Sequence, residues 1–218
     1  MIENLIWSYS FLSTFERCAR QAQARYITKE LPYSESPEMA YGNKVHQFME
    51  DRIKGAIREV PTEFAYLEKY IKKVQELSSL AFAEYQIGVR RDWSSTEFFA
   101  RDCWGRGKLD FCAIDGNFAI IFDWKTGKVR EDPYELEIQS LLLKCKHPYL
   151  EEIKGCYVWF KQDKFGQLYD LSSTDQTKKH VKEIMRQVSL ENWRASKNPL
   201  CPWCQVEQCP FFKETRKK

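Results

Sequence analysis

The sequence has no apolar run that approaches the roughly 20 residues of a membrane-spanning helix, so we expect no membrane span. Its first residues lack the basic stretch and following apolar stretch of a signal peptide, so we expect a cytoplasmic protein. A net charge of +3 is too small to indicate nucleic-acid binding by itself. No internal repeat or low-complexity segment is present. The 218 residues are 43% hydrophobic and 15% aromatic, which suits one folded domain, with or without a small appendage.

The positive charge is concentrated near the C-terminal end. Residues 178–218 contain ten Lys and Arg against four Asp and Glu, a local balance of +6. Such a segment can lie along a phosphate backbone. It can equally be the solvated face of a helix followed by a Lys-rich tail.

The spacing of hydrophobic residues changes from helical to strand-like near residue 84. The predicted helices are 9–27, 38–58, 61–83, 132–146 and 174–194. The predicted strands are 85–91, 96–103, 107–114, 117–124 and 155–161, with a short one near 167–171. The helix 132–146 is apolar on most sides, which indicates a buried crossover to a parallel strand. This order predicts an α/β fold with a small mixed sheet, helices on its faces and a helical N-terminal lobe.

We expect a single domain over residues 1–218. Within it, residues 1–83 form the mainly helical lobe, 84–172 the α/β core, and 173–218 the last helix and a cysteine-rich cap.

Two carboxylates and one lysine are predicted to converge at a hairpin. Asp115-Gly116 between two apolar runs predicts a two-residue turn. Counting outward from that turn places Asp110 opposite Ile121, and side-chain alternation then puts Asp110, Asp123 and Lys125 on one face. Asp123 follows an apolar run that suggests a strand buried on both faces. A buried carboxylate needs a partner, and the alternatives are a metal ion or a salt bridge with Lys125.

The chemistry of this set suits phosphodiester hydrolysis. Carboxylate oxygens are the ligands that Mg²⁺ or Mn²⁺ prefers. Such an ion lowers the pKa of a bound water and stabilises the charge that develops on a phosphate. Lys125 would orient that water or place a positive charge near the phosphate.

The chain resembles the RecB-like branch of the PD-(D/E)XK nuclease superfamily at three motifs. The core motif is Gly107-x-x-Asp110, followed by Asp123-Trp-Lys-Thr-Gly127. A Gly42-x-x-x-His46 motif precedes it, and Gln139 follows it. The resemblance spans residues 8–212. It implies a restriction-endonuclease-like core with a cysteine-liganded C-terminal cap.

The resemblance also implies roles for individual residues. The metal ligands would be His46, Asp110, Asp123 and the backbone carbonyl of Trp124. Lys125 would assist the attacking water, and Gln139 would orient Lys125 or the DNA strand. The family usually has an aromatic residue where this chain has Leu143, a departure from the pattern that concerns Gln139 and not the metal ligands. Glu84 is a weaker candidate for an additional acidic group.

Eight cysteines divide into two sets. Cys103, Cys112, Cys145 and Cys156 stand singly in apolar surroundings, and we interpret them as core residues. Cys201, Cys204 and Cys209 are spaced as metal ligands, and no His follows, which argues against a compact zinc knuckle. A fourth ligand must then come from elsewhere, and Cys18 is the natural candidate.

This second set resembles the cysteines of iron–sulfur nucleases in the RecB-like branch, including AddB-type and CRISPR-associated enzymes. The resemblance implies a structural [4Fe–4S] cluster held by Cys18, Cys201, Cys204 and Cys209. Zn²⁺ on the same thiolates is the alternative, and unligated reduced thiols are a third reading.

The function we expect is metal-dependent DNA exonuclease activity in recombination, repair or phage and CRISPR DNA processing. Exonuclease action is favoured over endonuclease action, on DNA that is single-stranded or has a free end, with recombination or CRISPR-adaptation proteins as partners. The alternatives are a catalytically inactive DNA-binding or scaffold protein and a nuclease for RNA or junctions. Oligomeric state is not predicted. Aromatic candidates for base stacking are Tyr9, Trp93, Trp104, Trp159 and Phe160.

Overall fold

The computed structural model describes residues 5–31, 34–77 and 80–212, and these form two compact units. The sheet unit is Glu35–Thr174. The terminal unit combines Met1–Ser34 with Asp175–Lys218, so it holds both ends of the chain. The expected single domain and its internal boundaries stay a prediction. In the described residues, no helix is long and apolar enough to cross a membrane.

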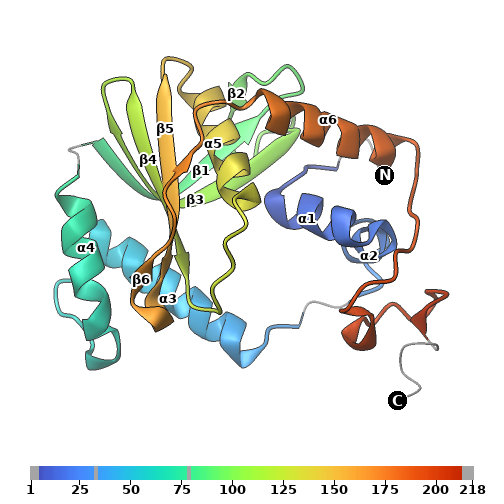
Figure 1. The fold of residues 1–218 in the computed structure, drawn as a ribbon, viewed down its shortest axis with the longest axis horizontal. Helices are drawn as coiled ribbons and strands as arrows, with labels where there is room; N and C mark the ends of the chain where they lie inside the picture. Colours follow the sequence, from blue (N-terminus) through green and yellow to red (C-terminus); the bar gives the residue numbers. More distant parts are fainter. Residues whose placement is uncertain (1–4, 32–33, 78–79, 213–218) are drawn as a thin grey trace. The chain divides into compact units, whose positions relative to one another are not determined.

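The sheet unit is built on a mixed sheet (Figure 1). Its strands are β1 (Leu80–Val89), β2 (Ser95–Thr96), β3 (Gly105–Asp115), β4 (Phe118–Lys125), β5 (Glu152–Trp159), β6 (Lys164–Phe165) and β7 (Tyr169–Asp170). The spatial order is β2-β1-β3-β4-β5-β6, and β7 also pairs with β5. Only β4 and β5 are parallel, joined by the helix α5 (Tyr134–Lys146). The predicted small mixed sheet and its crossover helix are confirmed.

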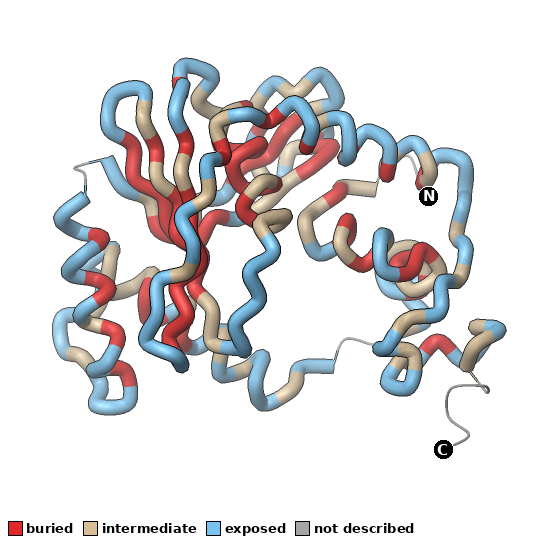
Figure 2. The backbone as a smooth tube through the Cα atoms, in the orientation of Figure 1, coloured by how far each residue is buried: buried red, intermediate tan, exposed pale blue. Residues whose placement is uncertain are grey.

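Helices cover the two faces of this sheet. On one face, α5 packs over β1, β3 and β4, and Leu142 of α5 lies against Gly107, where a Cβ atom would collide with it. On the other face, α3 (Pro37–Ile53), the 3₁₀ segment η3 (Thr62–Leu67) and α4 (Glu68–Gln75) share a core with β3, β4 and β5. Figure 2 shows the buried backbone concentrated along the central strands.

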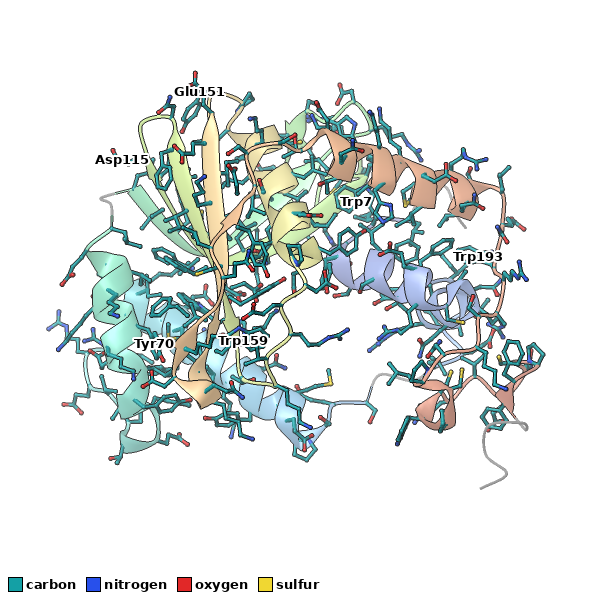
Figure 3. The ribbon with its side chains drawn as sticks, in the orientation of Figure 1. Trp7, Tyr70, Asp115, Glu151, Trp159 and Trp193 are labelled. Atoms are coloured by element: carbon teal, nitrogen blue, oxygen red, sulfur yellow. The ribbon has the colours of Figure 1, made fainter. Side chains whose placement is uncertain are left out.

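The β3–β4 hairpin has a different turn from the predicted one. Asp115 pairs with Phe118, so the turn residues are Gly116 and Asn117, and Gly116 has φ 57°. Glycine at the first turn position meets the positive φ that a two-residue hairpin turn requires there, whereas an Asp-Gly turn would place that demand on Asp115. Figure 3 shows Asp115 at this turn, at the end of the sheet away from Trp159.

Two predicted segments are wrong. Of the predicted strand 96–103 only Thr96 is in a strand, β2 (Ser95–Thr96). Asp102 accepts from Thr96 Oγ1 at 2.8 Å and pairs with Arg90 at 2.5 Å, which folds this stretch into turns. The helix predicted over 61–83 ends at Gln75, and β1 already begins at Leu80.

The terminal unit is helical. Its elements are α1 (Tyr9–Arg17), α2 (Ala19–Ala22), the π segment η2 (Gln23–Ile27), α6 (Asp175–Ser189) and the 3₁₀ turn η5 (Cys201–Trp203). The helix predicted over 9–27 is interrupted at Cys18, whose backbone is extended with φ −165°. In α6 the apolar residues are buried and the basic ones largely exposed, so the part of the basic segment that falls there forms a solvated helix face. Residues 213–218 of that segment lie outside the described residues.

Candidate metal centre

Strands β3 and β4 separate at the end of their hairpin farthest from the turn. Their pairing ends at Phe111 and Phe122, and continuing the register by one step places Asp110 opposite Asp123. The Trp124 N–H donates to Asp110 Oδ2 at 2.7 Å. The acceptor is therefore a side-chain oxygen of β3, where regular strand pairing would use a backbone carbonyl oxygen. Both aspartates are buried, with 8% and 2% exposure. The predicted register, which put Asp110 opposite Ile121, is therefore wrong by two residues.

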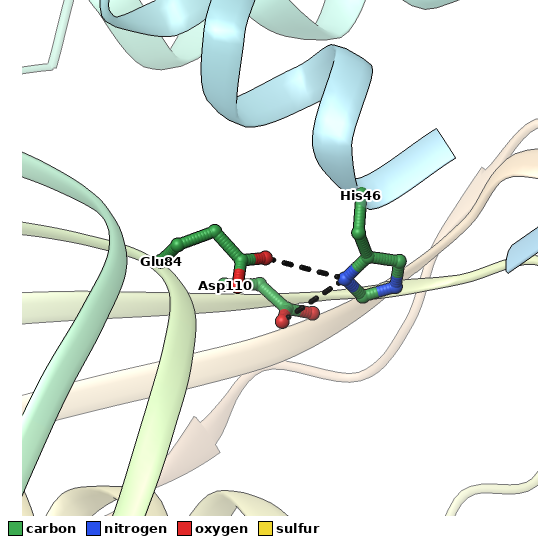
Figure 4. Close-up of side chains that lie close together, drawn as sticks. All are labelled: His46, Glu84 and Asp110. Atoms are coloured by element: carbon green, nitrogen blue, oxygen red, sulfur yellow. Dashed lines mark ion pairs between the residues drawn. The ribbon is translucent and has the colours of Figure 1, made fainter. Parts of the chain in front are cut away.

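Three potential metal ligands meet beside this separation (Figure 4). His46 of α3 places Nδ1 3.2 Å from Asp110 Oδ1 and 3.5 Å from Glu84 Oε1. One ligand atom from each residue lies within 4.8 Å of the other two. The other ring nitrogen of His46, Nε2, lies 3.1 Å from the Trp124 carbonyl oxygen.

This donor set fits a divalent cation. Both Glu84 oxygens are buried and accept no hydrogen bond from the described residues, being held only by ion pairs with His46 and Lys108. Carboxylate oxygens, a ring nitrogen and a nearby backbone carbonyl are the donors used by Mg²⁺ or Mn²⁺ sites in proteins. A cation among them would add a ligand to buried Glu84 oxygens that otherwise have only these ion pairs.

The carboxylates of Asp110 and Glu84 also favour a positive charge near them. Burial lowers the pKa of His46, but its bonds to Asp110 and Glu84 outweigh that and raise the pKa to about 10. Burial, followed by repulsion from Asp123, raises the pKa of Asp110 to about 6. Burial pushes the pKa of Glu84 up, but its bonds to His46 and Lys108 bring it below the ordinary value. The carboxylates therefore hold a proton on the ring in the absence of a metal ion.

A second group lies on the α5 side of the sheet. Lys125 Nζ lies 2.5 Å from Asp123 Oδ2 and 2.7 Å from Glu135 Oε2. Gln139 Nε2 donates to Asp123 Oδ1 at 2.7 Å. Glu135 and Gln139 stand four residues apart on α5, which puts them on one helix face. Burial, then repulsion from Asp123, raises the pKa of Glu135 to about 7. Burial lowers the pKa of Lys125, but the two carboxylates outweigh it and raise the pKa above its ordinary range.

The predicted site residues thus fall into two neighbouring groups. Asp110 joins His46, and the Trp124 carbonyl points to the same ring. Asp123 joins Lys125 and Gln139 instead, and Gln139 contacts Asp123 rather than Lys125. The metal roles assigned from the resemblance stay a prediction.

Sequence reasoning undervalued Glu84 and missed Glu135. Glu84 lies opposite Asp110 in the β1–β3 register, in the positive-φ region at φ 53°. That conformation turns the side chain toward His46, and periodicity carries no sign of it. Glu135 could have been predicted from the sequence. It lies one helical turn before Gln139, so a helix that points Gln139 toward Asp123 also points Glu135 toward Asp123.

The four cysteines of the predicted cluster lie in the terminal unit. Cys18, Cys201, Cys204 and Cys209 line one pocket. Backbone N–H groups point at two of the sulfurs: Ser196 N lies 3.5 Å from Cys18 Sγ, and Asn198 N lies 3.3 Å from Cys201 Sγ. The other four cysteines are buried, as predicted. Burial raises the pKa of the Cys112 thiol to about 12.

Comparison with known proteins gives one family match and a set of similar folds. The family model described as PD-(D/E)XK nuclease superfamily matches residues 6–210. The crystal structure of SSO0001 has a TM-score of 0.56 and 16% identity, over 95% of this chain and 86% of that chain. A protein from Eubacterium rectale, provisionally named an exonuclease, has a TM-score of 0.53 and 11% identity, over 97% and 88%. The predicted restriction-endonuclease-like core is confirmed. No curated protein sequence matches.

Proposed function

The chain belongs to the PD-(D/E)XK nuclease superfamily, and from that premise we propose that it is a divalent-metal-dependent DNA exonuclease. The observation that carries this proposal is the meeting of His46, Glu84 and Asp110 beside the ion pair of buried Asp123 with half-buried Lys125. Buried acidic groups, a ring nitrogen and a held ammonium group are the parts that phosphodiester hydrolysis needs. The exonuclease name of one structural neighbour supports the choice over endonuclease action.

The proposed metal ligands are His46, Asp110, Asp123, the Trp124 carbonyl and, in addition to those expected from the sequence, Glu84. When Mg²⁺ or Mn²⁺ is bound, it supplies an activated water and neutralises charge on the phosphate. The Trp124 N–H fixes one Asp110 oxygen, which leaves the other oxygen toward His46. The protein thus holds its ligands in place before the ion arrives.

Lys125 is proposed to place its ammonium group beside the reacting phosphate. Asp123 and Glu135 hold the ammonium from two sides, and the Tyr157 ring centroid lies 5.4 Å from Nζ. These contacts keep Lys125 charged, so its role is to orient water and stabilise negative charge rather than to accept a proton. Gln139 acts one step further away, by orienting Asp123.

The cysteine pocket is proposed to hold a structural [4Fe–4S] cluster on Cys18, Cys201, Cys204 and Cys209. The four cysteines line one pocket, and their resemblance to the cysteines of iron–sulfur nucleases favours the cluster over a single Zn²⁺. Backbone N–H groups near two sulfurs also suit anionic thiolates.

The proposal extends to compartment and partners. It places the protein in the cytoplasm, where thiols stay reduced. The substrate is DNA that is single-stranded or has a free end, and recombination or CRISPR-adaptation proteins are the expected partners.

The test uses end-labelled single- and double-stranded DNA with Mn²⁺ or Mg²⁺. Wild type should release short products progressively from an end, and Asp123→Ala should release none. Asp115→Ala is the control, because that exposed last residue of β3 lies beside the hairpin turn and away from the site. Internal cuts would indicate an endonuclease, and cutting of RNA alone would change the substrate. No cutting with any divalent ion, together with retained DNA binding, would favour an inactive binding protein.

A further inference from the structure

Two phenylalanines and one arginine form an exposed aromatic surface in the sheet unit. Phe99 is 77% exposed, and its ring meets Phe98 edge-on with centroids 4.9 Å apart. The Arg106 guanidinium lies 4.8 Å from the Phe98 centroid and 5.4 Å from the Phe99 centroid. Arg106 Nη1 also donates to the Phe98 carbonyl at 3.3 Å. We call these three residues the Phe98–Arg106 platform.

The platform is held in a fixed position rather than left loose. Its guanidinium is tied both to the rings and to a backbone carbonyl, and Arg106 belongs to a paired stretch of β3. Phe98 and Phe99 are adjacent, so together they form an apolar patch, which is more informative than a single exposed ring. A flat apolar ring beside a cation is a surface on which a nucleobase can stack.

Strand β3 connects the platform to the candidate metal centre. Its pairing with β1 is continuous from Gly105 to Leu109, so Arg106 and Lys108 point to the same side. Lys108 forms an ion pair with Glu84, one of the three potential ligands. Asp110 lies four positions along β3 from Arg106, or about 14 Å along an antiparallel strand. One further cation, Lys108, therefore lies between the platform and the acidic group.

We propose that the Phe98–Arg106 platform stacks a base of a single nucleic-acid strand whose phosphate lies at the metal centre. This inference rests on the proposed nuclease function and specifies its substrate. Arg106 at the platform and Lys108 between the two points neutralise phosphates of the strand. The separation corresponds to about four nucleotides at the roughly 3.4 Å spacing of a stacked strand, and fewer if the strand is extended.

The geometry selects an unpaired strand. A base inside a duplex has both faces covered by its neighbours, so it cannot lie on a protein ring without being unstacked first. A single strand presents its base faces at no such cost. The two cations on β3 suit a polyanion, which favours nucleic acid over a second copy of this chain as the occupant.

The experiment measures binding of fluorescent oligothymidylates of two to twelve nucleotides by anisotropy, with Ca²⁺ in place of Mg²⁺. Phe99→Ala is compared with Phe99→Trp, which keeps a ring. Tyr149→Ala is the matched control, because this aromatic residue of the sheet unit is 53% exposed and lies outside the platform. Cleavage of the same strands with Mn²⁺ is measured in parallel.

Phe99→Ala should weaken binding of strands longer than about six nucleotides roughly ten-fold, which is the loss expected for one stacked base. Phe99→Ala should bind the dinucleotide as tightly as wild type does. Phe99→Trp and Tyr149→Ala should bind every strand as tightly as wild type does. An abasic position three to five nucleotides from the cut should weaken wild type by the same factor and leave Phe99→Ala unchanged. For Arg106→Ala, the slope of log binding constant against log salt concentration should fall by about one, which corresponds to one phosphate contact fewer.

Two results separate the failure of this inference from the failure of the proposed function. If wild type cuts DNA and Phe99→Ala binds every strand as wild type does, the platform proposal is overturned and the nuclease stands. If Phe99→Ala changes only the oligomeric state, measured by sedimentation, the platform is a contact between copies of the chain. The proposal is then also overturned. If wild type neither binds nor cuts DNA, the proposed function itself fails.

Discussion

The side-chain amide of Gln139 donates a hydrogen bond to Asp123 Oδ1 over 2.7 Å, and both residues are buried. The bond joins helix α5 to strand β4 at the candidate site. It places Gln139 behind the carboxylate rather than beside Lys125. Gln139 therefore acts together with Asp123, and changing Gln139 alone tests its own contribution.

Gln139→Met keeps the length of the side chain and removes the hydrogen bond. A buried carboxylate oxygen is then left without its donor, which should lower the free energy of unfolding by about 1–3 kcal/mol. Losing the group that orients a proposed ligand should also weaken Mn²⁺ binding roughly 10- to 100-fold. Urea unfolding and Mn²⁺ titration measure the two effects. Gln86→Met, on the exposed part of β1, should change neither.

Glu135 gives a prediction for pH. Its pKa in the folded protein is about 7, against 4.5 ordinarily, chiefly because of burial. Between these values the folded state holds a proton that the unfolded state has lost, so stability falls as pH rises from about 4.5 to 7. In EDTA, the free energy of unfolding of wild type should therefore fall over this range relative to Glu135→Gln, by less than roughly 1.4 kcal/mol per pH unit. Equal slopes in urea unfolding at pH 5, 6 and 7 would contradict this.

Glu84 is the proposed ligand that the structure adds, and stabilisation by metal tests it. A ligand at 100 times its dissociation constant stabilises the folded state by about 2.7 kcal/mol. Mn²⁺ should raise the melting temperature of wild type, and Glu84→Gln should lose most of that rise because one donor oxygen loses its charge. Glu152→Gln, a mostly exposed change on β5, should keep it. An unchanged rise in Glu84→Gln would remove this residue from the site.

The cysteine pocket predicts a coloured protein. With a [4Fe–4S] cluster, anaerobically purified protein should be brown, with broad visible absorption that is lost in Cys204→Ala. Cys145→Ala removes a buried thiol of the sheet unit and should stay brown. A colourless protein with stoichiometric zinc would support the alternative metal.

Sequence reasoning predicted which side chains lie near one another more readily than how they are arranged, and their roles stay a prediction. Asp110, Asp123 and Lys125 were identified from hairpin counting and from an apolar strand that ends in a charge. The predicted register was wrong by two residues, and a shift by two leaves each side chain on the same face of the sheet. The three residues were therefore still predicted to share one face. Their division into two groups could not be predicted, because it depends on where β3 and β4 separate. That separation is set by packing on both faces of the sheet.

Other errors have local causes. The break at Cys18 was missed because the apolar spacing around it continues at helical period on both sides. Glu84 was undervalued because a positive φ in a non-glycine residue has no sequence signature. Phe99 was passed over as a stacking candidate, whereas three of the proposed aromatics, Trp104, Trp159 and Phe160, are buried.

The terminal unit is assembled from the first and last parts of the chain, with the whole sheet unit between them. During synthesis, Cys18 emerges more than 180 residues before Cys201. The sheet unit is contiguous, so its strands and helices can form while the N-terminal helices still await α6 and the last three cysteines. The cysteine pocket therefore needs residues from both sides of the sheet unit, and a chain that is truncated or stalled before residue 201 lacks three of its four cysteines. The pocket in this way becomes possible only after the whole sheet unit has been synthesised.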